Sequence, residues 1–125
     1  MFEIVVEDIF SAAHKLRNYK GKCENVHGHN WKVQVAVYGR DLDNRGLLLD
    51  FTVLKAELKK VLQSLDHKDI NNLPFFRKIN PTSENIAFYV HKKIKNSPAI
   101  KPARVKSVTV WESDRQYAIY TEEGS

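Results

Sequence analysis

The sequence predicts an α+β fold in which an antiparallel four-stranded sheet carries two helices on one face. Two segments of alternating polarity open the chain, two amphipathic segments follow, and two more alternating segments close it, which gives the order ββααββ. Runs of strands beside runs of helices are typical of α+β proteins with antiparallel sheets. With 125 residues, the chain is expected to form one domain over residues 1–125.

The first two strands are predicted over residues 2–14 and 29–38. Because side chains on a strand alternate between faces, residues of one parity share a side. The first strand places these residues together: Phe2, Ile4, Val6, Phe10, Ala12 and His14. In the second strand the apolar parity is that of Trp31, Val33, Val35 and Val37, and His27 and His29 are in phase with it.

The two helices are predicted over residues 52–65 and 81–96. Leucines at helical spacing form one stripe of the first helix, and lysines lie opposite. Thr52 and Thr82 are the expected N-caps. His91, beside two lysines, is expected at the surface. Closing strands are predicted over residues 105–113 and 116–122, around a tight turn at residues 114–115.

Composition and charge exclude several classes of protein. A single cysteine excludes an intramolecular disulfide, and no apolar stretch reaches the roughly 18–20 residues of a membrane span. The amino terminus has no basic region followed by an apolar run and a cleavage site, so a cytoplasmic protein is expected. The net charge of +5 is scattered over the chain, which favours a small anionic ligand over nucleic acid.

Three histidines suggest a metal site. His27 and His29 lie on one face of the second strand, and antiparallel pairing would bring His14 beside them. Three neutral imidazoles leave one open position on tetrahedral Zn²⁺, as in catalytic sites. Cys23 is the alternative fourth ligand, and with it the zinc would be structural.

Other polar residues stand out around this pattern. Cys23 needs nearby positive charge to form a reactive thiolate. Asp66 and His67 could form a carboxylate–imidazole pair. Glu112 continues the apolar parity of Val108 and Val110, so its carboxylate needs a partner. That partner is either an arginine, Arg104 or Arg115, or a ligand that presents two N–H groups side by side.

Together these motifs resemble the 6-pyruvoyl-tetrahydropterin synthase family, including its bacterial branch, 6-carboxy-tetrahydropterin synthase. The resemblance extends over nearly the whole chain, in the order and spacing of the family. It rests on FSAAH at 10–14, CENVHGHNW at 23–31, LLDFTVLK at 48–55, LDHKDIN at 65–71, NPTSENIA at 80–87 and VWES at 110–113.

The resemblance implies the tunnelling fold, whose trimers close a barrel and usually pair as hexamers, with sites at subunit interfaces. It implies zinc on His14, His27 and His29, and a catalytic set of Cys23, Asp66 and His67. Glu112 would anchor the pterin ring, and Thr82 lies in a segment that helps to hold it. The implied substrate is 7,8-dihydroneopterin triphosphate, for whose phosphates the candidates are Lys15, Arg17, Lys20 and Lys22.

The leading activity is that of the bacterial branch, which forms 6-carboxy-5,6,7,8-tetrahydropterin, acetaldehyde and triphosphate on the way to queuosine. The nearest alternative is 6-pyruvoyl-tetrahydropterin formation. Glu24, next to Cys23, is either a surface residue or a sign of additional cleavage to 6-hydroxymethyl-dihydropterin, a folate precursor. The non-enzymatic alternative is an oligomeric binding protein with structural zinc.

Overall fold

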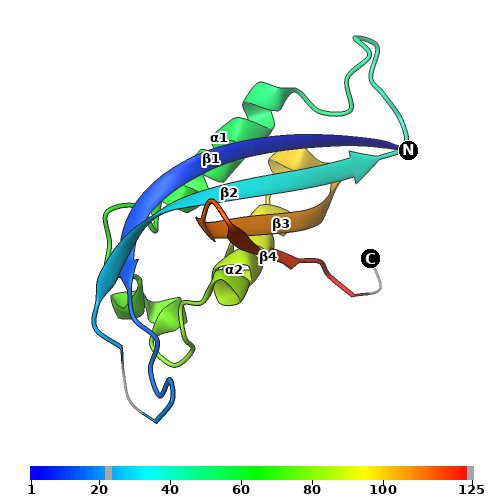
Figure 1. The fold of residues 1–125 in the computed structure, drawn as a ribbon. Helices are drawn as coiled ribbons and strands as arrows, with labels where there is room; N and C mark the ends of the chain where they lie inside the picture. The colour runs from blue at the N-terminus through cyan, green and yellow to red at the C-terminus, as the bar shows by residue number, and fades with distance from the viewer. Residues whose placement is uncertain (22–23, 124–125) are drawn as a thin grey trace.

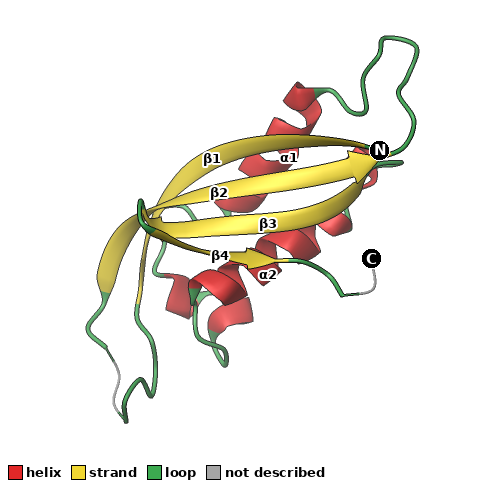
Figure 2. Cartoon of the chain, turned by 45° about the vertical axis from the view of Figure 1, so that its right-hand side comes forward, coloured by secondary structure: helices red, strands yellow, loops and turns green. Residues whose placement is uncertain are grey.

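Two helices pack against one face of a twisted four-stranded antiparallel sheet, in the predicted order ββααββ (Figures 1 and 2). The structure is a computed structural model that describes residues 1–21 and 24–123. The strands lie in the order β1-β2-β3-β4. The elements are β1 (Phe2–His14), β2 (His27–Gly39), α1 (Phe51–Gln63), α2 (Ser83–Lys95), β3 (Arg104–Ser113) and β4 (Gln116–Tyr120).

The pairing of β1 with β2 sets the position of the histidines. The register runs without interruption from Phe2 opposite Gly39 to His14 opposite His27. His29 lies opposite Ala12, two residues along the same face. The end of β1 therefore meets the start of β2, and β2 begins at the first histidine of the His-Gly-His motif.

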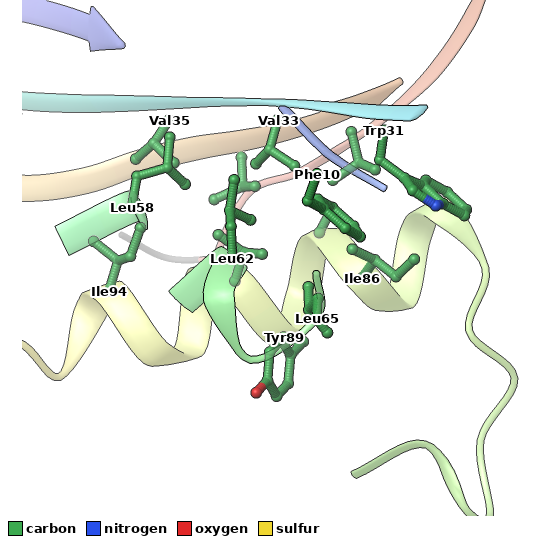
Figure 3. Packing of buried hydrophobic residues seen from close by; sticks show 14 of the residues in the cluster. Phe10, Trp31, Val33, Val35, Leu58, Leu62, Leu65, Ile86, Tyr89 and Ile94 are labelled. Atoms are coloured by element: carbon green, nitrogen blue, oxygen red, sulfur yellow. The ribbon is translucent and has the colours of Figure 1, made fainter. Parts of the chain in front are cut away.

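The core lies between the sheet and the helices (Figure 3). Trp31, Val33 and Val35 of β2 point toward the helices and are fully buried. The predicted helical stripes face them, because the apolar residues of both stripes are buried as well. These residues are Leu54, Leu58, Leu62 and Leu65, with Ile86, Val90 and Ile94 of α2. Phe10 stacks on Trp31 with ring centroids 5.9 Å apart, so an aromatic pair packs next to the histidine end of the sheet.

One of the two predicted caps is correct. Thr82 caps α2, since its hydroxyl accepts a hydrogen bond from the backbone N–H of Asn85 at 3.1 Å. The prediction of Thr52 for α1 is wrong, because α1 begins one residue earlier and Asp50 is its cap. The Asp50 carboxylate accepts hydrogen bonds from the backbone N–H and the hydroxyl of Thr52, both at 2.8 Å.

The expectation that His91 lies at the surface is also wrong. His91 is 2% exposed, and its ring packs edge-on against Tyr120 of β4 at a centroid distance of 4.8 Å. The reason is that α2 contacts both β3 and β4, so its buried face is wider than a single stripe. Lys92 and Lys93 are exposed, as expected.

None of the helices in the described ranges, 1–21 and 24–123, combines the length and the apolar character that crossing a membrane requires.

Candidate metal centre

Three imidazoles and one carboxylate converge at one end of the sheet. His14 ends β1, His27 and His29 begin β2, and Glu112 lies on β3. The nearest ligand atoms of these four side chains all lie within 4.8 Å of one another. The predicted convergence of the three histidines, which we call the histidine cluster, is therefore confirmed.

Backbone carbonyls set the tautomers of two of the rings. Nδ1 of His14 lies 2.8 Å from the carbonyl oxygen of Pro81, and Nδ1 of His27 lies 2.9 Å from that of Asn25. Because a carbonyl oxygen only accepts, Nδ1–H donates in both contacts, and Nε2 carries the lone pair of the neutral ring. A second hydrogen bond that fixes the ring in this way is characteristic of metal-binding histidines.

Two nitrogens of the cluster are buried and have no hydrogen-bond partner within residues 1–21 and 24–123. These are Nε2 of His14 and Nε2 of His29. Oε1 of Glu112 lies 3.3 Å from the first and 3.0 Å from the second. A lone pair on Nε2 of His14 facing a carboxylate oxygen is unfavourable unless a cation or a proton lies between them. The residues present therefore fit a bound metal ion.

The environment keeps the third ring neutral. Burial lowers the pKa of His29, and the neighbouring His14 and His27 lower it further against the opposing effect of Glu112. A neutral imidazole is the form that binds a metal. At neutral pH His29 is therefore ready to act as a ligand.

The predicted carboxylate–imidazole pair is present in the loop after α1. Oδ2 of Asp66 lies 3.0 Å from Nδ1 of His67. Oδ1 of Asp66 accepts a hydrogen bond from the backbone N–H of Ser11 at 2.9 Å, and this bond is the main reason that the pKa of Asp66 is lowered. The backbone N–H of His67 in turn donates a hydrogen bond to the backbone carbonyl of Ser11. The pair is thus fixed to β1, and the His67 side chain is 82% exposed.

One hollow brings the two groups of residues together. It has a volume of about 550 Å³ and is lined by residues of β1, of β2 and of the loop after α1. Among them are Ser11, Gly28, His29, Asn30 and His67. One residue of the histidine cluster, His29, and one of the carboxylate–imidazole pair, His67, therefore line the same hollow.

Glu112 contacts imidazoles rather than an arginine. Its two ion-pair contacts in the described part of the chain are His14 and His29, and neither Arg104 nor Arg115 is among its partners there. Of the two partners weighed from the sequence, the arginine is not found. The carboxylate faces the candidate metal centre instead.

Three further predicted residues, Glu24, Arg17 and Thr82, have polar groups that already make hydrogen bonds. Oε1 of Glu24 accepts a hydrogen bond from the backbone N–H of Leu16 at 3.0 Å. The Arg17 guanidinium donates three of its five N–H groups to backbone carbonyls, which leaves fewer donors for a phosphate. Thr82 is occupied by capping. Lys22 and Cys23 lie outside the described residues.

Comparison with known proteins shows the family to which the chain belongs. A family model described as 6-pyruvoyl tetrahydropterin synthase matches residues 3–123. The chain belongs to this family. It is 30% identical to the 6-carboxy-5,6,7,8-tetrahydropterin synthase of Haemophilus influenzae, over 98% of this chain and all of that protein. It is 33% identical to the human 6-pyruvoyl tetrahydrobiopterin synthase, over 91% of this chain and 87% of the human one.

The fold is that of the family as well. The solved structure of Caenorhabditis elegans 6-pyruvoyl tetrahydropterin synthase superposes with a TM-score of 0.83 and 30% identity, over 98% of this chain and 96% of that one. The predicted tunnelling fold is thereby confirmed. Since relatives with either product name are similarly close, family membership supports a pterin synthase without defining its product.

Proposed function

We propose that this chain is a zinc-dependent lyase, a 6-carboxy-5,6,7,8-tetrahydropterin synthase that converts 7,8-dihydroneopterin triphosphate to 6-carboxytetrahydropterin, acetaldehyde and triphosphate. The reaction would serve queuosine biosynthesis in the cytoplasm. The observation that carries the proposal is the histidine cluster, with two rings oriented by carbonyls and two buried Nε2 atoms that have no hydrogen-bond partner among the described residues.

His14, His27 and His29 would hold the zinc. Three imidazoles on one Zn²⁺ are the ligand set of a catalytic site that keeps a position open. When bound there, zinc supplies a Lewis acid that lowers the pKa of the hydroxyls on the substrate side chain.

The remaining chemistry belongs to the chain's own groups. Cys23 would move protons at the side-chain carbons of the substrate, and His67 would be its proton partner. Asp66 supports this role because its carboxylate holds Nδ1 of His67, leaving Nε2 for proton transfer. Glu112 would accept two N–H groups of the pterin ring, and the segment around Thr82 would help to hold that ring.

The side chain of Glu24 bears on the choice of product. A glutamate acting as the base in place of Cys23 would use a carboxylate oxygen, and one of the two oxygens of Glu24, Oε1, already accepts a hydrogen bond from the backbone N–H of Leu16. That bond braces the turn after β1. We therefore assign proton transfer to Cys23 and a bracing role to Glu24, which favours the carboxy product over 6-hydroxymethyl-dihydropterin.

The exposed edges of the sheet support a trimer-based homo-oligomer, which we propose to be a hexamer. β1 and β4 are the two edge strands. Apolar side chains lie exposed on both, with Ile9 at 67%, Tyr117 at 58% and Ile119 at 57%. Open edges with apolar side chains are surfaces that proteins normally cover. Sedimentation of the purified protein as a monomer would contradict the assembly.

The decisive experiment is an assay of purified, zinc-loaded protein with dihydroneopterin triphosphate. We expect acetaldehyde and triphosphate to appear in equal amounts. Triphosphate release without acetaldehyde would identify the 6-pyruvoyl activity and reject our assignment. Formation of 6-hydroxymethyl-dihydropterin would return Glu24 to a catalytic role. Absence of any turnover with one zinc per chain would favour the binding protein with structural zinc.

A further inference from the structure

The free edge of β1 is closed near the histidine cluster by a segment that is not a strand. Residues 66–81, which we call the closing segment, run along the side of β1 that faces away from β2. The backbone N–H groups of alternate residues on β1 and just beyond it donate to this segment: Ser11 to Asp66 Oδ1, Ala13 to the carbonyl of Lys68, Lys15 to Asn71 Oδ1 and Arg17 to Asn80 Oδ1. The segment thus takes the place of a neighbouring strand.

Two asparagine side chains act here as peptide groups. Asn71 accepts from the N–H of Lys15 at 2.9 Å and donates through Nδ2 to the carbonyl of the same residue at 3.0 Å. Asn80 forms the same pair of bonds with Arg17, at 2.8 and 3.0 Å. A carboxamide offers one acceptor and one donor group, as a peptide unit does. Each side chain therefore extends the pairing of β1 beyond His14.

The guanidinium of Arg17 fixes the closing segment from the other direction. Nη1 donates to the carbonyl of Ile79 at 3.1 Å, and Nη2 donates to those of Asn71 and Phe76 at 3.1 and 2.7 Å. Hydrogen bonds from a charged donor are stronger than neutral ones. Arg17 thus joins three separate points of the segment to the chain that follows His14.

The same segment orients a ring of the histidine cluster. Pro81 directly follows Asn80, and its carbonyl accepts the Nδ1–H of His14 at 2.8 Å. The backbone carbonyl of Asn80 is itself held, since Nδ2 of Asn85 in α2 donates to it at 2.8 Å. The dipeptide Asn80–Pro81 consequently binds the backbone just after His14 and the ring of His14 at once.

We propose that Asn80 and Arg17 are positioning residues for His14. They hold the Pro81 carbonyl where it keeps the proton of His14 on Nδ1 and leaves Nε2 directed into the histidine cluster. The expected effect on metal binding rests on the proposed function. The expected effect on the tautomer of His14 does not depend on a bound metal.

The first test reads the tautomer directly. Metal-free protein labelled with ¹⁵N-histidine is observed by NMR at pH 8, above the ordinary histidine pKa of about 6.5. We expect the wild type to show His14 protonated at Nδ1, and Asn80→Ala to show a mixture of tautomers. Asn72→Ala is the matched control, because Asn72 is exposed and its side chain makes no hydrogen bond within the described residues. A single Nδ1–H tautomer in Asn80→Ala would overturn the proposal.

The second test measures zinc affinity by competition with a chromophoric chelator, and Co²⁺ absorption reports the ligand geometry. We expect Asn80→Ala to bind zinc about 10- to 100-fold more weakly than the wild type, as is typical when a partner of a metal-binding histidine is lost. Asn72→Ala should bind as the wild type does. Equal affinity and an unchanged Co²⁺ spectrum in Asn80→Ala would overturn the positioning role.

A second variant guards against misfolding of the first. Arg17→Lys keeps the positive charge but loses the planar fork that reaches several carbonyls. It should weaken zinc binding in the same direction, and wild-type affinity in this variant would remove Arg17 from the proposal. A wild type that binds no zinc would defeat the proposed function alone, since the tautomer experiment would still decide the role of Asn80.

Discussion

Nε2 of His29 lies 3.0 Å from Oε1 of Glu112, and the same oxygen lies 3.3 Å from Nε2 of His14. One carboxylate oxygen is thus shared by two imidazoles at the point where strands β1, β2 and β3 come together. The carboxylate has two chemical uses there. It could complete the ligand set of a metal, or it could stay free to accept the N–H groups of a pterin ring.

We predict that Glu112→Gln keeps its zinc and loses affinity for the pterin. Three imidazoles are sufficient ligands, whereas an amide cannot accept two N–H groups as a carboxylate does. Each lost hydrogen bond to a charged group costs about 1.5–3 kcal/mol, so KM should rise on the order of 10- to 100-fold. Zinc per chain and steady-state kinetics measure the two effects.

Glu7→Gln is the control for this change, because Glu7 is exposed on β1 and far along the strand from the cluster. It should leave both zinc content and KM unchanged. Loss of zinc in Glu112→Gln would instead identify Glu112 as a fourth ligand, and its role as the pterin anchor would have to be abandoned.

Cys23→Ala should retain one zinc per chain while turnover falls by about two to four orders of magnitude. The expectation follows from assigning the metal to the histidine cluster and proton transfer to the thiolate, since a positioned acid–base group typically contributes that much. Zinc analysis and triphosphate release, measured on the same preparation, give the answer. If zinc is lost together with the thiol, the centre is a closed structural site.

The side-chain period of a β-strand explains why the histidine cluster could be predicted. Parity alone places His27 and His29 on one face, and antiparallel pairing brings His14 opposite them. The contacts that orient these rings could not be predicted in the same way. The carbonyls of Pro81 and Asn25 are backbone groups, and no residue type in the sequence marks them as partners.

The two wrong sequence predictions, an exposed His91 and a Thr52 cap, have similar causes. Two lysines after His91 suggested an exposed face, but burial there depends on β4, which packs on α2 from a distant part of the sequence. Asp50 and Thr52 are both good capping residues, and only the backbone conformation at the start of α1 decides between them. In each case tertiary contacts or local geometry outweighed a reasonable local pattern.

Zinc binding should weaken as the solution becomes acidic. Protons compete with the metal for the imidazoles. Since burial lowers the pKa of His29, this ligand stays neutral somewhat below the ordinary histidine value of about 6.5. We therefore expect full occupancy from pH 8 down to about pH 6.5 and progressive loss toward pH 5. Dialysis against metal-free buffers followed by metal analysis measures this. Unchanged zinc at pH 5 would count against ligation by three histidines.

The buried imidazole of His91 should make the fold sensitive to acid independently of the metal. Burial lowers the pKa of His91, and Lys95 lowers it further against the opposing effect of Glu122. The folded state therefore binds this proton less readily than the unfolded chain does. By linkage, the stability that the folded protein has with a neutral His91 is fully present above the unfolded pKa of about 6.5. This stability is lost as the pH falls below that value.

His91→Phe removes this titration while keeping an aromatic ring against Tyr120. We expect the free energy of unfolding of the variant to fall less between pH 7.5 and 5.5 than that of the wild type. Urea denaturation of metal-free protein measures it, because the histidine cluster then contributes equally to both. Equal slopes for His91→Phe and the wild type would show that the buried ring carries no proton-linked cost.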